Sequence, residues 1–419
     1  MSSALAVVAA ALLGYAAVSR RLDGTPVTAA MVFVGIGLLF GPKVLGEVEF
    51  PPTGHTVRGL AEATLTLVLF ADAARIDLRA LRREYAVPAR LLGIGLPLTV
   101  VAGAAAAAAL FPSLTLVEAL VVGILLAPTD AALGQAVVTL PSLPSRIRQG
   151  LNVESGLNDG ICVPLLFVAL AAAEAQSGLE SDGTAARLVS EAIGYGVVGG
   201  AIAGSVAAAV VVYAGRRGLI APAWLQVIPV AAAALAYGIA APLHGSGFIA
   251  AFVGGLVFGA LRRRGEAEDT YLLDQAGGVL DAVTFLVFGA VLLEPSLEHL
   301  SWQVVLYAVL SLTVVRMLPV ALAMLRSGAE PPTVAFLGWF GPRGLASIVF
   351  AVIVVEEADL PQTSTIVLVT YATVGLSVLL HGLSAAPLAD RYARWYARGT
   401  RLMESVAAAP QRWRITSPF

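Results

Sequence analysis

The sequence predicts an all-α membrane protein that crosses the bilayer many times. Of its 419 residues, 58% are hydrophobic and 13% are charged, whereas soluble domains carry about 25% charged residues. Apolar runs long enough to cross a bilayer follow one another along almost the whole chain. The few polar residues inside these runs are costly in hydrocarbon, so they indicate where function lies.

Glycine, proline and charged residues divide the chain into thirteen apolar segments. We expect one transmembrane helix in each, near residues 3–19, 26–41, 57–77, 87–110, 116–140, 148–174, 187–213, 219–240, 245–260, 271–293, 300–325, 332–355 and 362–388. The tail, residues 390–419, mixes arginines with aromatic residues, which predicts a short helix at the inner membrane surface or, equally, a disordered end.

Basic residues gather in alternate loops of this layout. The loops after the first, third, fifth, seventh, ninth and eleventh segments, together with the tail, hold most of the 26 lysines and arginines. Because basic loops stay on the cytoplasmic side, we expect a multi-pass protein of the cell membrane. Its amino terminus should lie outside and its carboxyl terminus in the cytoplasm.

The fifth segment, 116–140, contains a predicted break. Pro128 lies in its middle and removes one helical hydrogen bond. Thr129 and Asp130 follow directly, and an aspartate at this point can cap the second half-helix. A broken helix in mid-membrane also exposes carbonyl oxygens and a half-helix amino terminus, which is how transporters build ion sites.

The sixth segment carries the densest group of polar residues. Its motif, QGLNVESGLNDGICVP, contains Glu154, Ser155, Asn158 and Asp159. Ser155 and Asp159 are four residues apart and share one helix face. Serine and carboxylate oxygens suit a small hard cation, so this face is a candidate cation site.

The rise per residue of an α-helix predicts the same depth in the membrane for Asp130 and Asp159. Asp130 lies about 15 Å from the cytoplasmic end of the fifth helix, and Asp159 lies about 16 Å from the cytoplasmic end of the sixth. Both distances are about half of the ~30 Å hydrocarbon core. We therefore expect the two carboxylates to meet at the midplane of the membrane.

Glu154 lies on another face of the sixth helix and needs a positively charged partner. Arg343 lies at a similar depth in the twelfth segment and is the predicted partner. Arg316 is interpreted instead as a snorkelling or structural arginine, and His381 as a packing residue near the end of the last segment.

Gly341, Pro342 and Gly344 predict a second broken helix in the twelfth segment. The fifth and twelfth segments are seven apart. This spacing favours two inverted six-helix repeats around a linker helix at 187–213, with the two broken helices crossing at the midplane.

Several motifs, in this order, resemble the sodium/proton antiporters of the monovalent cation–proton antiporter superfamily, in the NhaP and NHE branch. They are LLAPTDAALGQAVV, GLNVESGLNDGICVP, GSGFIAAFVGGLVFG, FLVFGAVL and GPRGLAS, with LVLFADAARID as a looser match. The resemblance implies a transmembrane antiporter domain over 1–389, with dimerisation helices 1–3 and 8–10. Helices 4–6 and 11–13 would form a core that moves like an elevator, in a homodimer.

The same resemblance implies roles for individual residues. Asp159 would bind sodium and a proton alternately, with Asp130, Ser155, the Thr129 carbonyl and possible water-mediated contact from Asp72 completing the site. Glu154 and Arg343 would form a structural ion pair beside Asn158. Glu62 is a weaker candidate for the site than Asp72.

The sequence thus predicts an electroneutral exchanger of sodium, and of lithium, for protons, with no cofactor beyond the transported ions and no nucleic-acid partner. The Asn158–Asp159 pair resembles the electroneutral branch of this superfamily, whereas the electrogenic branch has two aspartates there, so the resemblance implies electroneutral exchange. A potassium/proton antiporter of the same branch and a cation channel are the nearer alternatives. An intramembrane aspartyl protease using Asp130 and Asp159 would need a GxGD pattern, which GLNDG does not supply.

Overall fold

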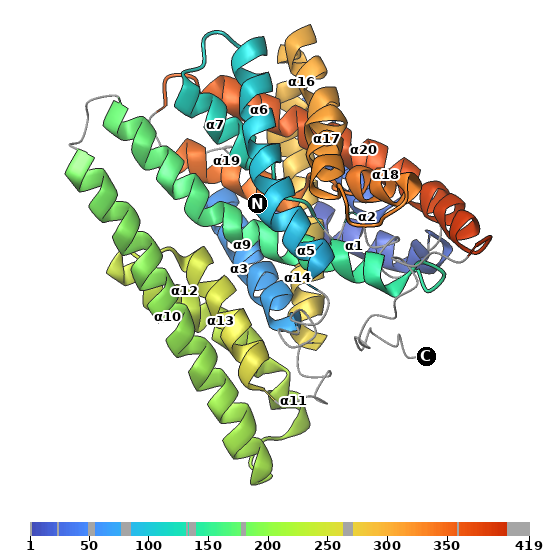
Figure 1. Cartoon of the computed structure of the whole chain (residues 1–419). Coiled ribbons are helices and arrows are strands. Elements are labelled where there is room, and N and C mark those ends of the chain that lie inside the picture. Colours follow the sequence, from blue (N-terminus) through green and yellow to red (C-terminus); the bar gives the residue numbers. More distant parts are fainter. Residues whose placement is uncertain are drawn as a thin grey trace.

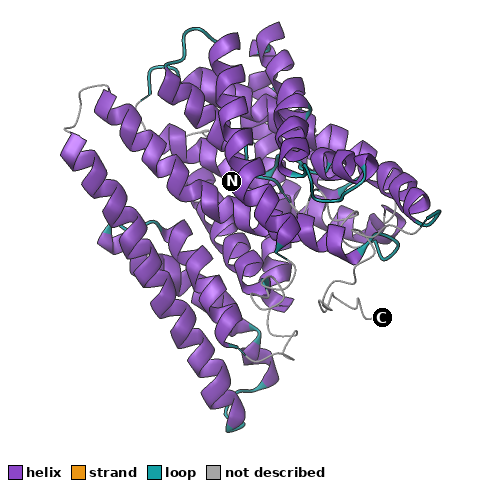
Figure 2. Ribbon diagram, viewed as in Figure 1, coloured by secondary structure: helices purple, strands orange, loops and turns teal. Residues whose placement is uncertain are grey.

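The protein is built from helices joined by short loops (Figures 1 and 2). The computed structural model describes residues 2–22, 25–48, 55–76, 85–130, 133, 140–176, 182–262, 271–357 and 360–399. Within these ranges there is no β-strand, so the all-α prediction is confirmed for the described part of the chain.

The helices coincide with the apolar segments of the sequence. They are α1 (Ser2–Leu22), α2 (Ala29–Phe40), α3 (His55–Arg75), α5 (Ala86–Arg90), η1 (Leu91–Gly95), α6 (Leu96–Leu110), α7 (Leu116–Leu125), α9 (Ser145–Gln176), α10 (Asp182–Arg216), α11 (Pro222–Leu225), α12 (Val227–Ala240), η2 (Ala241–Leu243), α13 (Gly247–Leu261), α14 (Tyr271–Val287), η4 (Phe288–Leu293), α15 (Glu294–Ser296), η5 (Leu297–His299), α16 (Trp302–Leu312), α17 (Val314–Ala323), α18 (Pro331–Trp339), α19 (Leu345–Glu357) and α20 (Thr363–Tyr396). The last helix therefore continues into the predicted tail, and residues 400–419 lie outside the described part.

Many of these helices are long enough to cross a membrane. In the described residues, eight are at least 18 residues long and sufficiently apolar, and four shorter apolar helices accompany them. These lengths agree with a multi-pass membrane protein. The count of thirteen crossings and the inverted repeat stay predictions.

The helices pack in two neighbouring groups. Helices α10, α12 and α13 pack on one another and on α3, whereas α16, α17, α18 and α20 lie on the opposite side with α6 and α7 (Figure 1). Gly200 and Gly204 of α10 face the backbone of α13 with no room for a side chain. Small residues allow such close helix contacts in membranes.

Two helices are interrupted where the sequence predicts breaks. Helix α7 ends at Leu125 and the chain is non-helical through Asp130. Helix α18 ends at Trp339, and the non-helical segment 340–344 precedes α19. The two breaks touch, because the Asp130 N–H donates to the Pro342 carbonyl over 2.8 Å.

Candidate ion-binding site

The break after α7 is held by groups from the second broken helix. Arg343 Nη1 donates to the carbonyls of Ala127 at 3.3 Å and Pro128 at 3.4 Å, and to its own break at Gly341 O, 3.1 Å away. Ser347 Oγ donates to Leu125 O at 2.6 Å. A helix end leaves carbonyls without partners, and here a buried guanidinium and a hydroxyl supply the missing donors.

Asp130 joins the two breaks through its carboxylate. Oδ2 accepts the Leu345 N–H, the first of α19, over 2.9 Å, and Oδ1 accepts the Leu133 N–H over 3.4 Å. Negative charge at a half-helix amino terminus is favourable because the helix dipole is positive there. Asp130 thus caps α19 and also contacts the Leu133 N–H. Apart from Leu133, the predicted second half of the fifth helix up to residue 139 lies outside the described residues.

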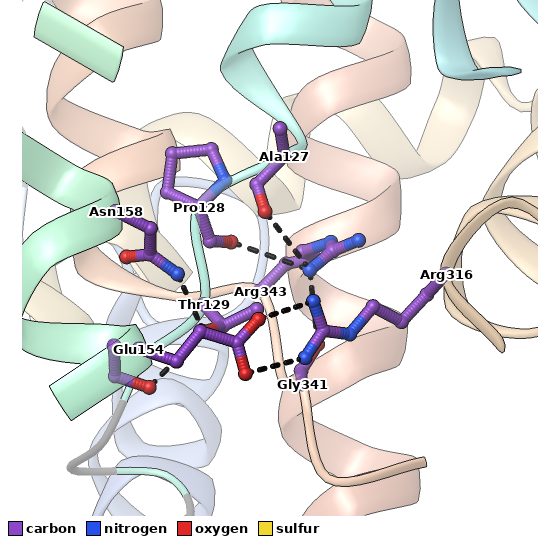
Figure 3. A network of polar contacts seen from close by, with 9 residues as sticks. Ala127, Pro128, Thr129, Glu154, Asn158, Arg316, Gly341 and Arg343 are labelled. Carbon is purple, nitrogen blue, oxygen red and sulfur yellow. Dashed lines mark hydrogen bonds and ion pairs between the residues drawn. The ribbon is translucent and has the colours of Figure 1, made fainter. Parts of the chain in front are cut away.

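Thr129 connects the first break to α9. Its hydroxyl lies 3.0 Å from Ser155 Oγ and accepts a hydrogen bond of 2.7 Å from Asn158 Nδ2 (Figure 3). All three side chains are buried. The structure therefore brings together Thr129 and Ser155, as the sequence analysis expects, but through the Thr129 hydroxyl. It also places the Asn158 amide on this hydroxyl, where the sequence analysis expects it beside a Glu154–Arg343 pair.

Asp159 lies on α9, one turn beyond Ser155, and is only 8% exposed. Its Oδ1 atom is buried and has no hydrogen-bond partner among the described residues, and the same holds for Asn158 Oδ1. A buried carboxylate without donors is costly unless a proton or a cation compensates its charge. Asp159 is therefore a carboxylate that needs such a ligand.

Glu154 forms its ion pair with Arg316, not with Arg343, so the predicted pairing is wrong. Arg316 Nη1 and Nη2 donate to the two carboxylate oxygens at 2.6 and 2.9 Å, and both side chains are 1% exposed (Figure 3). Arg316 belongs to α17, whereas Arg343 turns toward the carbonyls of the break. The bidentate geometry is the strong form of this contact.

Sequence reasoning missed Arg316, although a signal was present. Arg316 and Arg343 are the arginines that lie farthest from the ends of the predicted spans, and the sixth segment holds an acid in need of a partner. The predicted depth in the membrane was the one criterion for choosing the partner of Glu154, and it favoured Arg343. What decides the pairing is which side chain faces α9, and that depends on how α17 packs.

Asp72 also comes close to this site. Its Cβ lies 3.5 Å from where a Cβ on Gly156 would stand, so α3 passes directly beside the Ser155 turn of α9. Its Oδ1 accepts a bond of 3.2 Å from Arg75 Nη1, and Arg75 also pairs with Asp274 of α14. Glu62 lies ten residues away on α3, about 15 Å, and pairs with Arg58 at 2.7 Å.

The oxygen atoms available to bind a cation belong to different chemical groups. Among the described residues, no three His, Cys, Asp or Glu side chains are grouped so that they could hold a metal ion. A cation next to Asp159 would therefore also use hydroxyl or carbonyl oxygens, such as those of Ser155 and Thr129. Such neutral oxygens are suitable ligands for weakly charged hard ions.

Gly344→Ala should disturb the Asp130 carboxylate. A Cβ at this position would collide with Asp130 Oδ2, which caps α19. We expect a fall of about tenfold in apparent cation affinity, because the half-buried Asp130 carboxylate loses a backbone donor. Gly278→Ala, where a Cβ meets open space, is the matched control. Equal affinities for both variants, measured as cation-dependent transport, would contradict this assignment.

The chain is similar to known cation–proton antiporters. The sodium/hydrogen exchanger transmembrane family matches residues 7–391. Over 351 residues the chain is 31% identical to the Na(+)/H(+) antiporter NhaP of Pseudomonas aeruginosa, covering 78% of this chain and 79% of that protein. Over 388 residues it is 27% identical to the K(+)/H(+) antiporter NhaP of Alkalimonas amylolytica, covering 90% of this chain but 63% of that protein.

The fold is shared with a solved structure. The sodium proton antiporter MjNhaP1 from Methanocaldococcus jannaschii at pH 8 superposes with a TM-score of 0.75 at 20% identity, covering 90% of this chain and 98% of that one. The resemblance drawn from the motifs is thereby confirmed. The chain belongs to the sodium/hydrogen exchanger family of monovalent cation–proton antiporters, which are transporters and not enzymes.

Proposed function

We propose that this protein exchanges sodium, and also lithium, for protons with a stoichiometry of one to one. The observation that carries the proposal is the buried Asp159 carboxylate, one turn from the Thr129–Ser155 pair, whose Oδ1 has no partner in the part of the chain that the structure describes. Protonation or cation binding would each compensate this charge. Because one carboxylate cannot hold both ligands, their competition couples the two fluxes.

In the proposed cycle, Asp159 releases its proton and binds the cation together with Ser155, the Thr129 carbonyl and Asp130. Asp72 contributes through water. Binding neutralises the site, which lowers the electrostatic barrier to crossing the membrane. Arg316 binds both oxygens of Glu154, and the exchanged proton is assigned to Asp159 alone. Exchange of one monovalent cation for one proton moves no net charge.

We further propose an elevator movement of a core, helices 4–6 and 11–13, against dimerisation helices 1–3 and 8–10 in a homodimer. Glycines at the contact between the two groups support this proposal. Gly156 and Gly160 of α9 face Asp72 of α3 and the Phe252 ring of α13, without room for larger side chains at Gly160. Glycines add no protruding side chains to a helix surface, so the core helices can move along the dimerisation helices at this contact.

The names of the relatives supply two candidates for the transported cation. One relative is named a sodium/proton antiporter and another a potassium/proton antiporter, and potassium is the second candidate. We propose the cell membrane as the location, with the amino terminus outside and the carboxyl terminus in the cytoplasm, because basic residues alternate between loops.

Purified protein in liposomes with an internal pH-sensitive dye tests this proposal. A sodium or lithium gradient should drive proton movement in the opposite direction, and a potassium gradient should do so less. The rate should not change when a potassium diffusion potential is imposed with valinomycin, since exchange is electroneutral. Cation flux without proton movement would indicate a channel and would refute the proposal.

A further inference from the structure

A buried histidine on the last helix contacts the second helix break. His381 of α20 is 1% exposed, and its ring stacks on Trp339 with centroids 5.1 Å apart. Nε2 lies 2.9 Å from the Trp339 carbonyl, and Nδ1 lies 3.2 Å from Ser377 Oγ. Trp339 is the last residue of α18, so the ring touches the point where the helix stops.

The hydrogen-bond chemistry gives these contacts a direction. Each ring nitrogen of His381 faces a carbonyl, because Nδ1 also lies 3.1 Å from the Ser377 carbonyl. The shorter contact, from Nε2 to the Trp339 carbonyl, is assigned the ring hydrogen, since a carbonyl only accepts. In that neutral ring Nδ1 is an acceptor, and the Ser377 hydroxyl is the group that can donate to it. Ser377 Oγ itself accepts the Arg343 N–H at 2.7 Å. Two side chains of α20 thereby bind Trp339, just before the segment 340–344, and Arg343 within it.

The segment between these two ties carries contacts to the ion site. The Pro342 carbonyl accepts from the Asp130 N–H, and the Leu345 N–H just after the segment donates to Asp130 Oδ2. The Arg343 side chain binds the carbonyls of Ala127 and Pro128, next to Thr129. A shift of the segment would therefore move Asp130 and the Thr129 peptide together.

We propose that His381 and Ser377 form a latch that positions the ion site through the segment 340–344. They are positioning residues, since neither touches Asp159 in the described contacts. The inference rests on the proposed function, because it assigns how the same site is held in shape. Loss of the latch should weaken cation binding more than it slows the transport of a bound cation.

The test compares His381→Leu and Ser377→Ala with wild type in liposomes. Each should raise the KM for the cation about tenfold, since one buried hydrogen-bond partner is lost, while the maximal rate changes less than about threefold. The double variant should be no worse than the poorer single variant, because both residues act in one unit. Ser377→Thr keeps the hydroxyl and should retain a near-normal KM.

Ser384→Ala is the matched control. Ser384 Oγ accepts from Trp339 Nε1 at 2.9 Å, so it also joins α20 to α18 but does not bind the segment 340–344. It should leave the KM unchanged. If it raises the KM as much as Ser377→Ala does, or if Ser377→Ala leaves the KM unchanged, the latch is refuted.

Cation-induced thermal stabilisation of the detergent-purified variants gives a readout that is independent of transport. The cation concentration for half-maximal stabilisation should rise for Ser377→Ala and His381→Asn, and not for Ser384→Ala. His381→Asn keeps a short side chain near Ser377 but cannot reach Trp339, so it replaces His381→Leu if that variant fails to fold. Absence of exchange by the wild type would instead refute the proposed function.

Discussion

Replacement of Asp159 by asparagine is expected to abolish cation–proton exchange while the protein stays folded. The side chains have nearly the same shape, but the amide carries no charge and does not exchange a proton, so neither ligand can compete for the site. Sodium-driven proton movement in liposomes should fall to the level of empty vesicles. Cation-induced thermal stabilisation should vanish as well, since the cation loses the Asp159 carboxylate, whose Oδ1 has no hydrogen-bond partner among the described residues.

Glu118→Gln is the matched control for that experiment. Glu118 is also buried, but its two oxygens accept the backbone N–H groups of Thr115 and Gln362 at 2.8 and 2.9 Å, at the far end of α7. Losing its charge should lower stability, because a capping box is weakened, and leave the coupling of the two fluxes intact. Undiminished exchange by Asp159→Asn would show that another group carries the proton.

Breaking the buried ion pair is expected to have the largest effect on stability. Arg316→Ala leaves the Glu154 carboxylate buried and uncompensated, and removing one partner of such a pair costs about 3–5 kcal/mol. The thermal unfolding temperature of the detergent-purified protein should fall by many degrees. Glu154→Leu combined with Arg316→Met should regain most of the loss, because apolar residues of similar size can replace a buried pair.

Thermal unfolding measurements also test which of the two arginines, Arg316 or Arg343, pairs with Glu154. A double-mutant cycle should give strong coupling between Glu154 and Arg316 and little between Glu154 and Arg343. Arg187→Ala, which removes an exposed partner of Glu191, should change stability little, since surface pairs contribute little. Stronger coupling to Arg343 than to Arg316 would restore the pairing predicted from depth.

Local chemistry made much of this architecture predictable. Pro128 removes a helical hydrogen bond wherever the rest of the chain lies, so the break after α7 follows from sequence. The equal depth expected for Asp130 and Asp159 rests on the helical rise and the basic loop between their helices, and it stays a prediction. The helix bounds agree with the apolar segments because burial in lipid requires unbroken internal hydrogen bonding.

Only the tertiary structure decided which groups meet across different helices. Two arginines lie deep within apolar segments. The residues around each of them in the sequence do not indicate that Arg316 pairs with Glu154 or that Arg343 binds carbonyls of the first break. The contact of His381 with Trp339 likewise joins residues of separate helices. Sequence determines a helix, its breaks and the depth of its polar groups, because these depend on neighbours along the chain. The rotation and packing of helices determine partners, because a buried charge is stabilised by whichever group packing brings within hydrogen-bond distance.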